Sequence, residues 1–179
     1  MLPIPLITGV PQDPALLEQL INQYVLTAIN SSAPGLLSSA LTSTGNTADT
    51  NEDTLQTFSL APGLLNVNGK GLRIKAWGST ANNADTKALR IYHGTTVLNF
   101  ALNTASAAVW TAEFVILRTG AATQVASGTV LHGAALIAPL SASGTDTLAN
   151  QLTAKITGQA SAANANDIVC TAAYVELLQ

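Results

Sequence analysis

The chain has 179 residues, a net charge of −3 and only 9% charged residues, so its length suits one domain with a short appendage. This low charge, with 47% apolar residues, excludes the charge-rich composition of disordered chains. Aromatic residues make up 4%, and alanine supplies much of the apolar content, so each buried residue removes little surface from water. A core of this kind gains from burying further surface between copies, which favours an oligomer.

The first twelve residues predict an extended arm, because Pro3, Pro5 and Pro11 fix the backbone and remove hydrogen-bond donors. The arm is too short to form a core, so its apolar side chains are expected to lie on the rest of the fold, on a neighbouring subunit or on a different protein. These side chains are Leu2, Ile4, Leu6 and Ile7.

A helix is expected to begin at Asp13-Pro14, since Asp suits the N-cap and Pro the first helical position. Its seam would follow a spacing of four, three and four residues, and it would end at residues 30–35. Two alternatives stay open: the helix docks on its own domain, or it forms a short parallel bundle on an oligomer axis. The seam residues are Leu17, Ile21, Tyr24 and Ala28.

Residues 36–51 are small and polar after Leu41 and predict a linker. We therefore expect residues 1–52 to form an anchoring or trimerising arm, helix and linker. Residues 53–179 would form the main domain.

Residues 71–98 carry the clearest strand pattern, with apolar side chains at every second position on both sides of a polar run at 78–85. The pattern predicts a β-hairpin with a long loop. Its outer face would bring basic and aromatic residues together, namely Arg73, Lys75, Trp77, Arg90 and Tyr92.

Further strand-like runs at 55–60, 97–102, 109–117, 124–131, 134–140, 148–156 and 168–178 bring the total to about eight or nine strands. No helical run lies between them, so the prediction is an all-β antiparallel sandwich, a jelly roll of about eight strands. An immunoglobulin-like sandwich is the alternative. Residues 109–117 are apolar on both faces, which is typical of a strand inside a sandwich or at a subunit interface.

Side chains that could carry chemistry are few and scattered. His93 and His132 lack the spacing of metal ligands, and Cys170 is expected to be a buried hydrophobe. Glu113 and Glu176 could face one another as in a glycosidase, so a jelly-roll hydrolase is one functional hypothesis. The sequence favours a protein that is not an enzyme, with no cofactor, no metal and no small-molecule substrate.

The basic residues on the predicted hairpin could form a solvated face, a nucleic-acid site or a protein contact, in which arginine and aromatic residues are enriched. The negative total charge argues against nucleic acid. No stretch is apolar for the roughly 20 residues that a membrane span needs, and the amino end lacks the basic start of a signal peptide. We expect neither nucleic acid nor membrane as a partner.

Residues 54–99 resemble a segment that recurs in structural proteins of tailed bacteriophages. The matching elements are SLAPGLL, NGKGLRIKAWGST, ANNADTKALRI and the glycine at 94, over about a quarter of the chain. The resemblance implies a trimeric jelly roll on a virion, as in capsid decoration (cement) proteins, head fibres and tail appendages. It brings no catalytic residues with it.

The leading hypothesis is therefore a homotrimeric decoration protein, made in the host cytoplasm, that binds the major capsid protein on the virion surface. The alternative is a receptor- or carbohydrate-binding head of a fibre, with loops near residues 82–83 and 158–166 as its contact surface. The residues expected at the trimer or capsid interface are Leu6, Ile7, Leu17, Ile21, Tyr24, Ala28, Arg73, Lys75, Trp77, Arg90 and Tyr92.

Overall fold

The structure is a computed structural model that describes residues 13–16, 18–19, 35–102 and 107–178. The chain divides into two compact units, Met1–Ala33 and Pro34–Gln179. In the first unit the described residues after Asp13 are helical, and the Asp13 carboxylate accepts a hydrogen bond of 2.9 Å from the backbone N–H of Ala15. This is the geometry of the predicted N-cap.

The rest of the predicted arm and helix lies outside the described residues. It includes the expected interface positions Leu6, Ile7, Leu17, Ile21, Tyr24 and Ala28. None of the helices that the structure does describe has the length and apolar character to cross a membrane.

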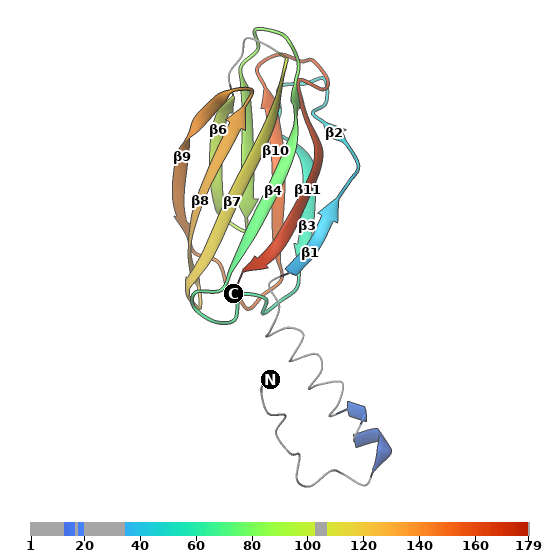
Figure 1. Cartoon of the computed structure of the whole chain (residues 1–179), viewed down its shortest axis with the longest axis vertical. Helices are drawn as coiled ribbons and strands as arrows, with labels where there is room; N and C mark the ends of the chain where they lie inside the picture. The colour runs from blue at the N-terminus through green and yellow to red at the C-terminus, as the bar shows by residue number, and fades with distance from the viewer. Residues whose placement is uncertain (1–12, 17, 20–34, 103–106, 179) are drawn as a thin grey trace. The chain divides into compact units, whose positions relative to one another are not determined.

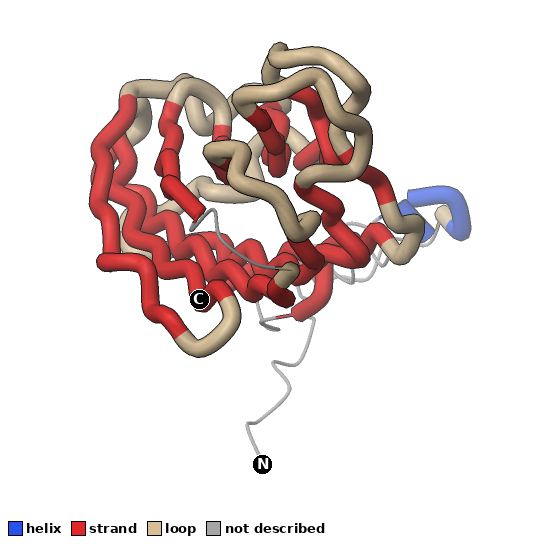
Figure 2. Tube along the Cα trace, turned by 90° about the horizontal axis from the view of Figure 1, so that it is seen from above, coloured by secondary structure: helices blue, strands red, loops and turns tan. Residues whose placement is uncertain are grey.

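The second unit consists of two antiparallel β-sheets packed face to face (Figures 1 and 2). The larger, seven-stranded sheet, here called sheet A, has the order β1-β11-β4-β7-β8-β9, with β2 also paired to β11. The four-stranded sheet B has the order β3-β10-β5-β6. The strands are β1 (Gly35–Ala40), β2 (Thr44–Gly45), β3 (Asp53–Leu60), β4 (Gly71–Thr80), β5 (Lys87–His93), β6 (Thr96–Leu102), β7 (Ala108–Gly120), β8 (Thr123–His132), β9 (Ala135–Gly144), β10 (Leu152–Ala160) and β11 (Ile168–Leu178).

The predicted all-β antiparallel sandwich is thus confirmed, and the jelly roll in particular stays a prediction. The core forms because each strand turns alternate side chains inward. Trp110 and Phe114 of β7 are fully buried, as are Leu89 and Ile91 of β5 on the other sheet. Cys170 on β11 is also fully buried, as predicted, and burial raises the pKa of its thiol to about 12.

The predicted hairpin at residues 71–98 is wrong. β4 pairs with β11 and β7 in sheet A, whereas β5 pairs with β10 and β6 in sheet B. Residues 81–86 therefore carry the chain from one sheet to the other. Both arrangements bury the same alternate side chains, so the period of two did not distinguish a hairpin from this crossing.

The predicted linker is wrong at residues 36–40 and 44–45, which belong to strands β1 and β2 and pair with β11. β1 lies at the edge of sheet A, and most of its side chains are exposed, Leu36 among them. An edge strand with few inward side chains has no clear alternation, which is why these residues read as loop. The compact unit starts at Pro34 and includes them.

The core makes a direct prediction for stability. We expect Phe114→Ala to lower the free energy of unfolding by about 3–5 kcal/mol, because a fully buried ring is lost and a cavity remains. Chemical denaturation followed by tryptophan fluorescence measures the change.

The matched control is Thr111→Ala on the same strand, where the side chain is exposed and the expected change stays within about 0.5 kcal/mol. Equal effects at the two positions would contradict the assignment of inner and outer faces.

Candidate interaction surfaces

The outer face of sheet A carries a cluster of four charges, which we call the ionic cluster. Arg73 on β4 lies between two carboxylates, 3.7 Å from Glu113 on β7 and 3.5 Å from Glu176 on β11. Lys75 lies 3.0 Å from the second Glu113 oxygen, and this contact raises the pKa of Lys75. The two acids and two bases sum to zero net charge. Such part-exposed pairs contribute little to the stability of a single subunit.

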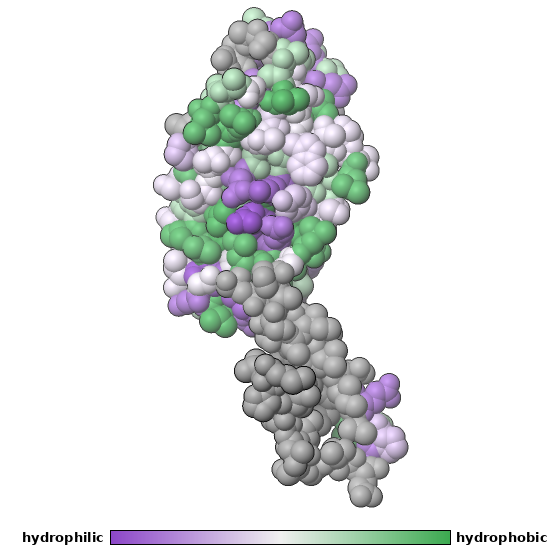
Figure 3. All heavy atoms as spheres, in the orientation of Figure 1, coloured by the Kyte–Doolittle hydropathy of each residue, from purple (hydrophilic) through white to green (hydrophobic). Residues whose placement is uncertain are grey.

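Exposed apolar side chains lie on both sides of the ionic cluster along the strands. At one end Leu117 and Val125 are direct cross-strand neighbours, and at the other Leu131 neighbours Leu136. Leu136 keeps 66% of its surface exposed. Figure 3 shows the hydrophilic cluster in the middle of this face with hydrophobic patches around it.

Aromatic residues extend the same face. Trp77 is partly exposed, and its ring meets that of Tyr174 edge to face, with centroids 6.2 Å apart. The prediction that 109–117 is apolar on both faces is also informative. Trp110 and Phe114 fill the core, whereas Val109 is 70% exposed on the outside. Large apolar side chains grouped on an open sheet face are typical of an interaction site.

The prediction that Arg90 and Tyr92 share a face with Arg73, Lys75 and Trp77 is wrong. They lie on the other sheet, because β5 belongs to sheet B. On the outer side of sheet B both bind one carboxylate, that of Glu52. Arg90 donates to it over 3.0 Å and the Tyr92 hydroxyl over 2.7 Å. Partial burial, together with the hydrogen bond to Glu52, raises the pKa of Tyr92 to about 12. Arg90 and Tyr92 therefore both bind a residue of their own subunit.

The five described residues of the predicted interface therefore divide into two groups. Arg73, Lys75 and Trp77 lie together on sheet A, and Arg90 and Tyr92 lie together on sheet B. Glu113 of β7 pairs with Arg73 and Lys75 of β4. The reason is the crossing between sheets, which places β7 rather than β5 beside β4.

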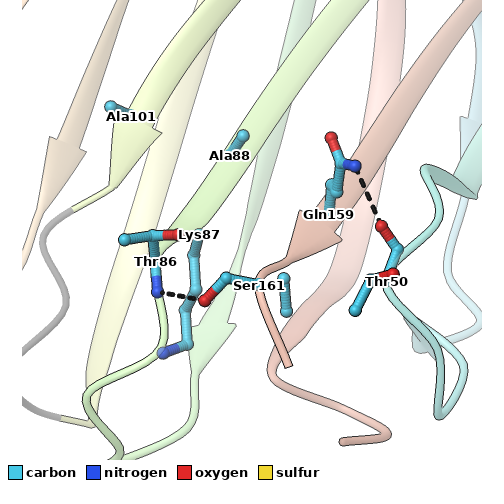
Figure 4. A pocket seen from close by; sticks show the side chains of 8 residues that line it. Thr50, Thr86, Lys87, Ala88, Ala101, Gln159 and Ser161 are labelled. Atoms are coloured by element: carbon cyan, nitrogen blue, oxygen red, sulfur yellow. Dashed lines mark hydrogen bonds between the residues drawn. The ribbon is translucent and has the colours of Figure 1, made fainter. Parts of the chain in front are cut away.

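A shallow hollow of about 400 Å³ lies on the outer side of sheet B, where β5 begins and β6 and β10 end (Figure 4). Ala88 and Ala101 are cross-strand neighbours that supply methyl groups. Around them, Gln159 donates to the Thr50 carbonyl over 2.9 Å, and the Ser161 hydroxyl accepts the Thr86 N–H over 2.9 Å. The complete lining is Thr50, Thr86, Lys87, Ala88, Ala101, Gln159, Ala160 and Ser161.

The two histidines lie in the interior, hydrogen-bonded, and away from both outer faces. His93 Nδ1 lies 2.8 Å from the amide oxygen of Gln124, while the Gln124 nitrogen donates to Thr96 and Asp146 over 2.6 and 2.7 Å. Because the Gln124 oxygen must then accept, we assign the His93 proton to Nδ1. His132 Nε2 lies 2.8 Å from the Thr80 hydroxyl. Both rings cross-link strands within the sandwich.

The carboxylates considered for hydrolysis do not form an open acid–base pair. Glu113 and Glu176 do lie on one face, but Arg73 lies between them and contacts both. Within the described residues, no group of three or more His, Cys, Asp or Glu side chains could hold a metal ion. The arrangement on sheet A is suited to contact with another surface.

Three exposed residues of the sheet A face were not predicted from the sequence, namely Val125, Leu131 and Leu136. On β8 the inward positions include the polar Gln124 and His132, which are buried because they hydrogen-bond to the other residues of the interior. The usual rule of apolar inside and polar outside is therefore reversed at both ends of this strand. One sequence signal could have indicated these exposed residues. Val125 and Leu131 are separated by an even number of positions, so they lie on the same side of β8.

Burial sets the pH dependence of stability. Burial lowers the pKa of His93, and burial followed by the Lys87 charge lowers that of His132. The unfolded chain therefore binds more protons than the folded one below the ordinary histidine pKa of about 6.5, so stability is full above that pH and falls as pH decreases through it. We expect a lower denaturation midpoint at about pH 5.5 than at about pH 7.5.

Denaturation of His93→Asn and His132→Asn over the same range separates the two contributions. Each variant should lose part of the pH slope, whatever its absolute stability. A slope that survives both substitutions would assign the pH dependence to groups other than the two histidines.

Comparison with known proteins adds no assignment to this geometry. No protein-family model matches the chain, and no curated protein matches it.

Proposed function

We propose that the chain is a structural virion protein, a homotrimeric capsid decoration (cement) protein that binds the major capsid protein and stabilises a bacteriophage head. The observation that carries the proposal is the outer face of sheet A, where exposed apolar side chains surround the neutral ionic cluster. The location on a virion rests on the resemblance of residues 54–99 to phage structural proteins.

The chemistry of this face suits contact with further copies of the chain. Leu117, Val125, Leu131 and Leu136 supply apolar area, and specific interfaces bury about 800 Å² on each partner. The ionic cluster contains equal numbers of both signs, so a copy can oppose each charge with its complement. Lys75 and Glu113, which are each 40% exposed at the side chain, become better shielded from water in such a contact.

The proposed mechanism is mechanical. A trimer that binds the assembled shell and not the free capsid subunits stabilises the shell by mass action. The arm at residues 1–12 would add apolar contacts to the capsid protein or to a neighbouring subunit. No bond is made or broken, and no cofactor takes part.

Assembly is tested by a charge placed in the apolar part of the face. We expect the wild-type protein to scatter light as a trimer, and Leu131→Glu to weaken association by at least about tenfold, because the buried carboxylate has no partner. The measurement is mass by light scattering over a concentration series.

The matched control is Val97→Glu, which places the same charge on the outer face of sheet B, where Val97 is exposed to a similar degree. It should leave the mass unchanged. A wild-type monomer at micromolar concentration, or dissociation caused by both variants alike, would contradict the proposed face.

A second candidate function is the binding of a carbohydrate by a fibre head, and the hollow on sheet B favours it. The hollow is lined by methyl groups and by a rim of hydroxyl and amide groups. Lys87 is its one charged lining residue, and its amine is directed to Asn83 and Asp85. Such a rim can hydrogen-bond sugar hydroxyls. The hollow also adjoins part of the predicted loop 158–166, which is wrong at residues 158–160 because these belong to β10.

A glycan array tests this second function. Ala88→Tyr should abolish binding, because the larger side chain fills the hollow. Gln151→Ala, which lies outside the hollow, should preserve it. This pair of results would place the sugar in the hollow. An array with no positive glycan, alongside a trimeric wild-type protein, favours the decoration protein.

A further inference from the structure

An amine, a carboxamide and a carboxylate meet at the point where the chain enters β5. Lys87 Nζ lies 2.5 Å from the side-chain oxygen of Asn83, and the Asn83 nitrogen donates to Asp167 Oδ1 over 2.6 Å. Lys87 is 3% exposed and Asp167 1%. The three groups therefore form one line, with the Asn83 amide in the middle, and neither the proposed interface nor the hollow explains them.

Lysine is an unexpected choice at this position. Lys87 has the inward parity of Leu89 and Ile91 on β5, where an ammonium group is costly to bury. It donates to Asn83 and to the Asp85 carbonyl over 3.0 Å, which satisfies only part of its capacity. Asp167 Oδ2 is buried and has no hydrogen-bond partner among the described residues. Two ionisable groups are thus buried together with incomplete hydrogen bonding.

We propose that Lys87 and Asn83 form an intramolecular amide (isopeptide) bond, with Asp167 as the catalytic acid–base. Along the two hydrogen bonds, the ammonium passes a proton to Oδ1 of Asn83 while Nδ2 passes one to Asp167, which gives a neutral amine. Nζ then attacks Cγ of Asn83, the Nζ–Cγ bond forms, and the Cγ–Nδ2 bond breaks. The leaving nitrogen takes up the two protons held by Oδ1 and Asp167 and departs as ammonia, and the proton that Nζ releases remains on Asp167. No oxidant or reductant is required.

The surroundings favour this reaction over simple hydrogen bonding. The fold holds the amine against the amide at all times, so the step is unimolecular and gains the large advantage of proximity. Asp167 already binds the nitrogen that has to leave, which is the position required of a general acid. The product no longer contains the buried ammonium of Lys87.

The bond would close a ring over residues 83–87, at the end of the segment that carries the chain from sheet A to sheet B. This segment is also tied to the loop before β11, since Ala81 N–H donates to the Asp167 carbonyl over 3.0 Å. The covalent ring would therefore hold the crossing in one conformation. This inference is independent of the proposed function, because it uses no residue of the outer face of sheet A.

The test is the mass of the intact wild-type protein under denaturing conditions. It should be lower than the mass of the sequence by one ammonia. Trypsin cleaves after lysine and arginine residues with a free side chain. The digest should therefore contain the peptide Ala76–Arg90 uncut at Lys87, and its mass should also be lower by one ammonia. A succinimide at Asn68-Gly69 would lose ammonia in a different peptide, and one at Asn82 or Asn83 would leave Lys87 cleavable.

Three variants supply the controls. Lys87→Arg and Asp167→Asn should both have the full mass of their sequences, whereas Lys75→Arg, a change at a part-exposed lysine, should keep the loss of ammonia. The wild-type mass decides the question even if an interior variant fails to fold. A wild-type protein with its full mass and normal cleavage at Lys87 overturns the proposal and leaves three hydrogen-bonded side chains.

Discussion

The structure depends on the packing of two inner sheet faces against each other. Trp110 and Phe114 of β7 lie in the middle of sheet A, and Leu89 and Ile91 of β5 oppose them from sheet B. With so few aromatic rings in the chain, these side chains carry a large share of the buried apolar area. Everything on the outer faces is positioned by this contact, because the pleat turns each strand's remaining side chains outward.

The two outer faces differ in character, and that difference suggests their roles. On sheet B, Arg90 and Tyr92 bind Glu52 inside the subunit. On sheet A, the ionic cluster is small and neutral, and large apolar side chains around it remain exposed. A single subunit gains little from ion pairs that water surrounds, whereas a contact that excludes water strengthens them and buries the apolar area. The proposed assembly through sheet A would therefore make use of features that a monomer leaves unexplained.

The interior is more polar than a sandwich with an alanine-rich composition would suggest. Gln124 joins His93 to Asp146, and Asn83 joins Lys87 to Asp167. The first group connects β5 of sheet B to β8 of sheet A and to the loop after β9. The second connects β5 to the loop before β11. Hydrogen bonds of this kind tolerate few alternative arrangements, so they define one register between the ends of the sandwich.

The sequence by itself determined the antiparallel β-class, the burial of Cys170 and the inward parity of residues such as Ile74 and Ile91, because alternation at a period of two reports which side of a strand faces the core. It also indicated that β7 is apolar on its outer side. Only the tertiary structure decided that β4 and β5 belong to different sheets, that β1 is a strand and that Glu113 meets Lys75. The physical reason is that alternation names a face but not a neighbour. Which strands pair depends on contacts between residues far apart in the chain, and no local pattern encodes them.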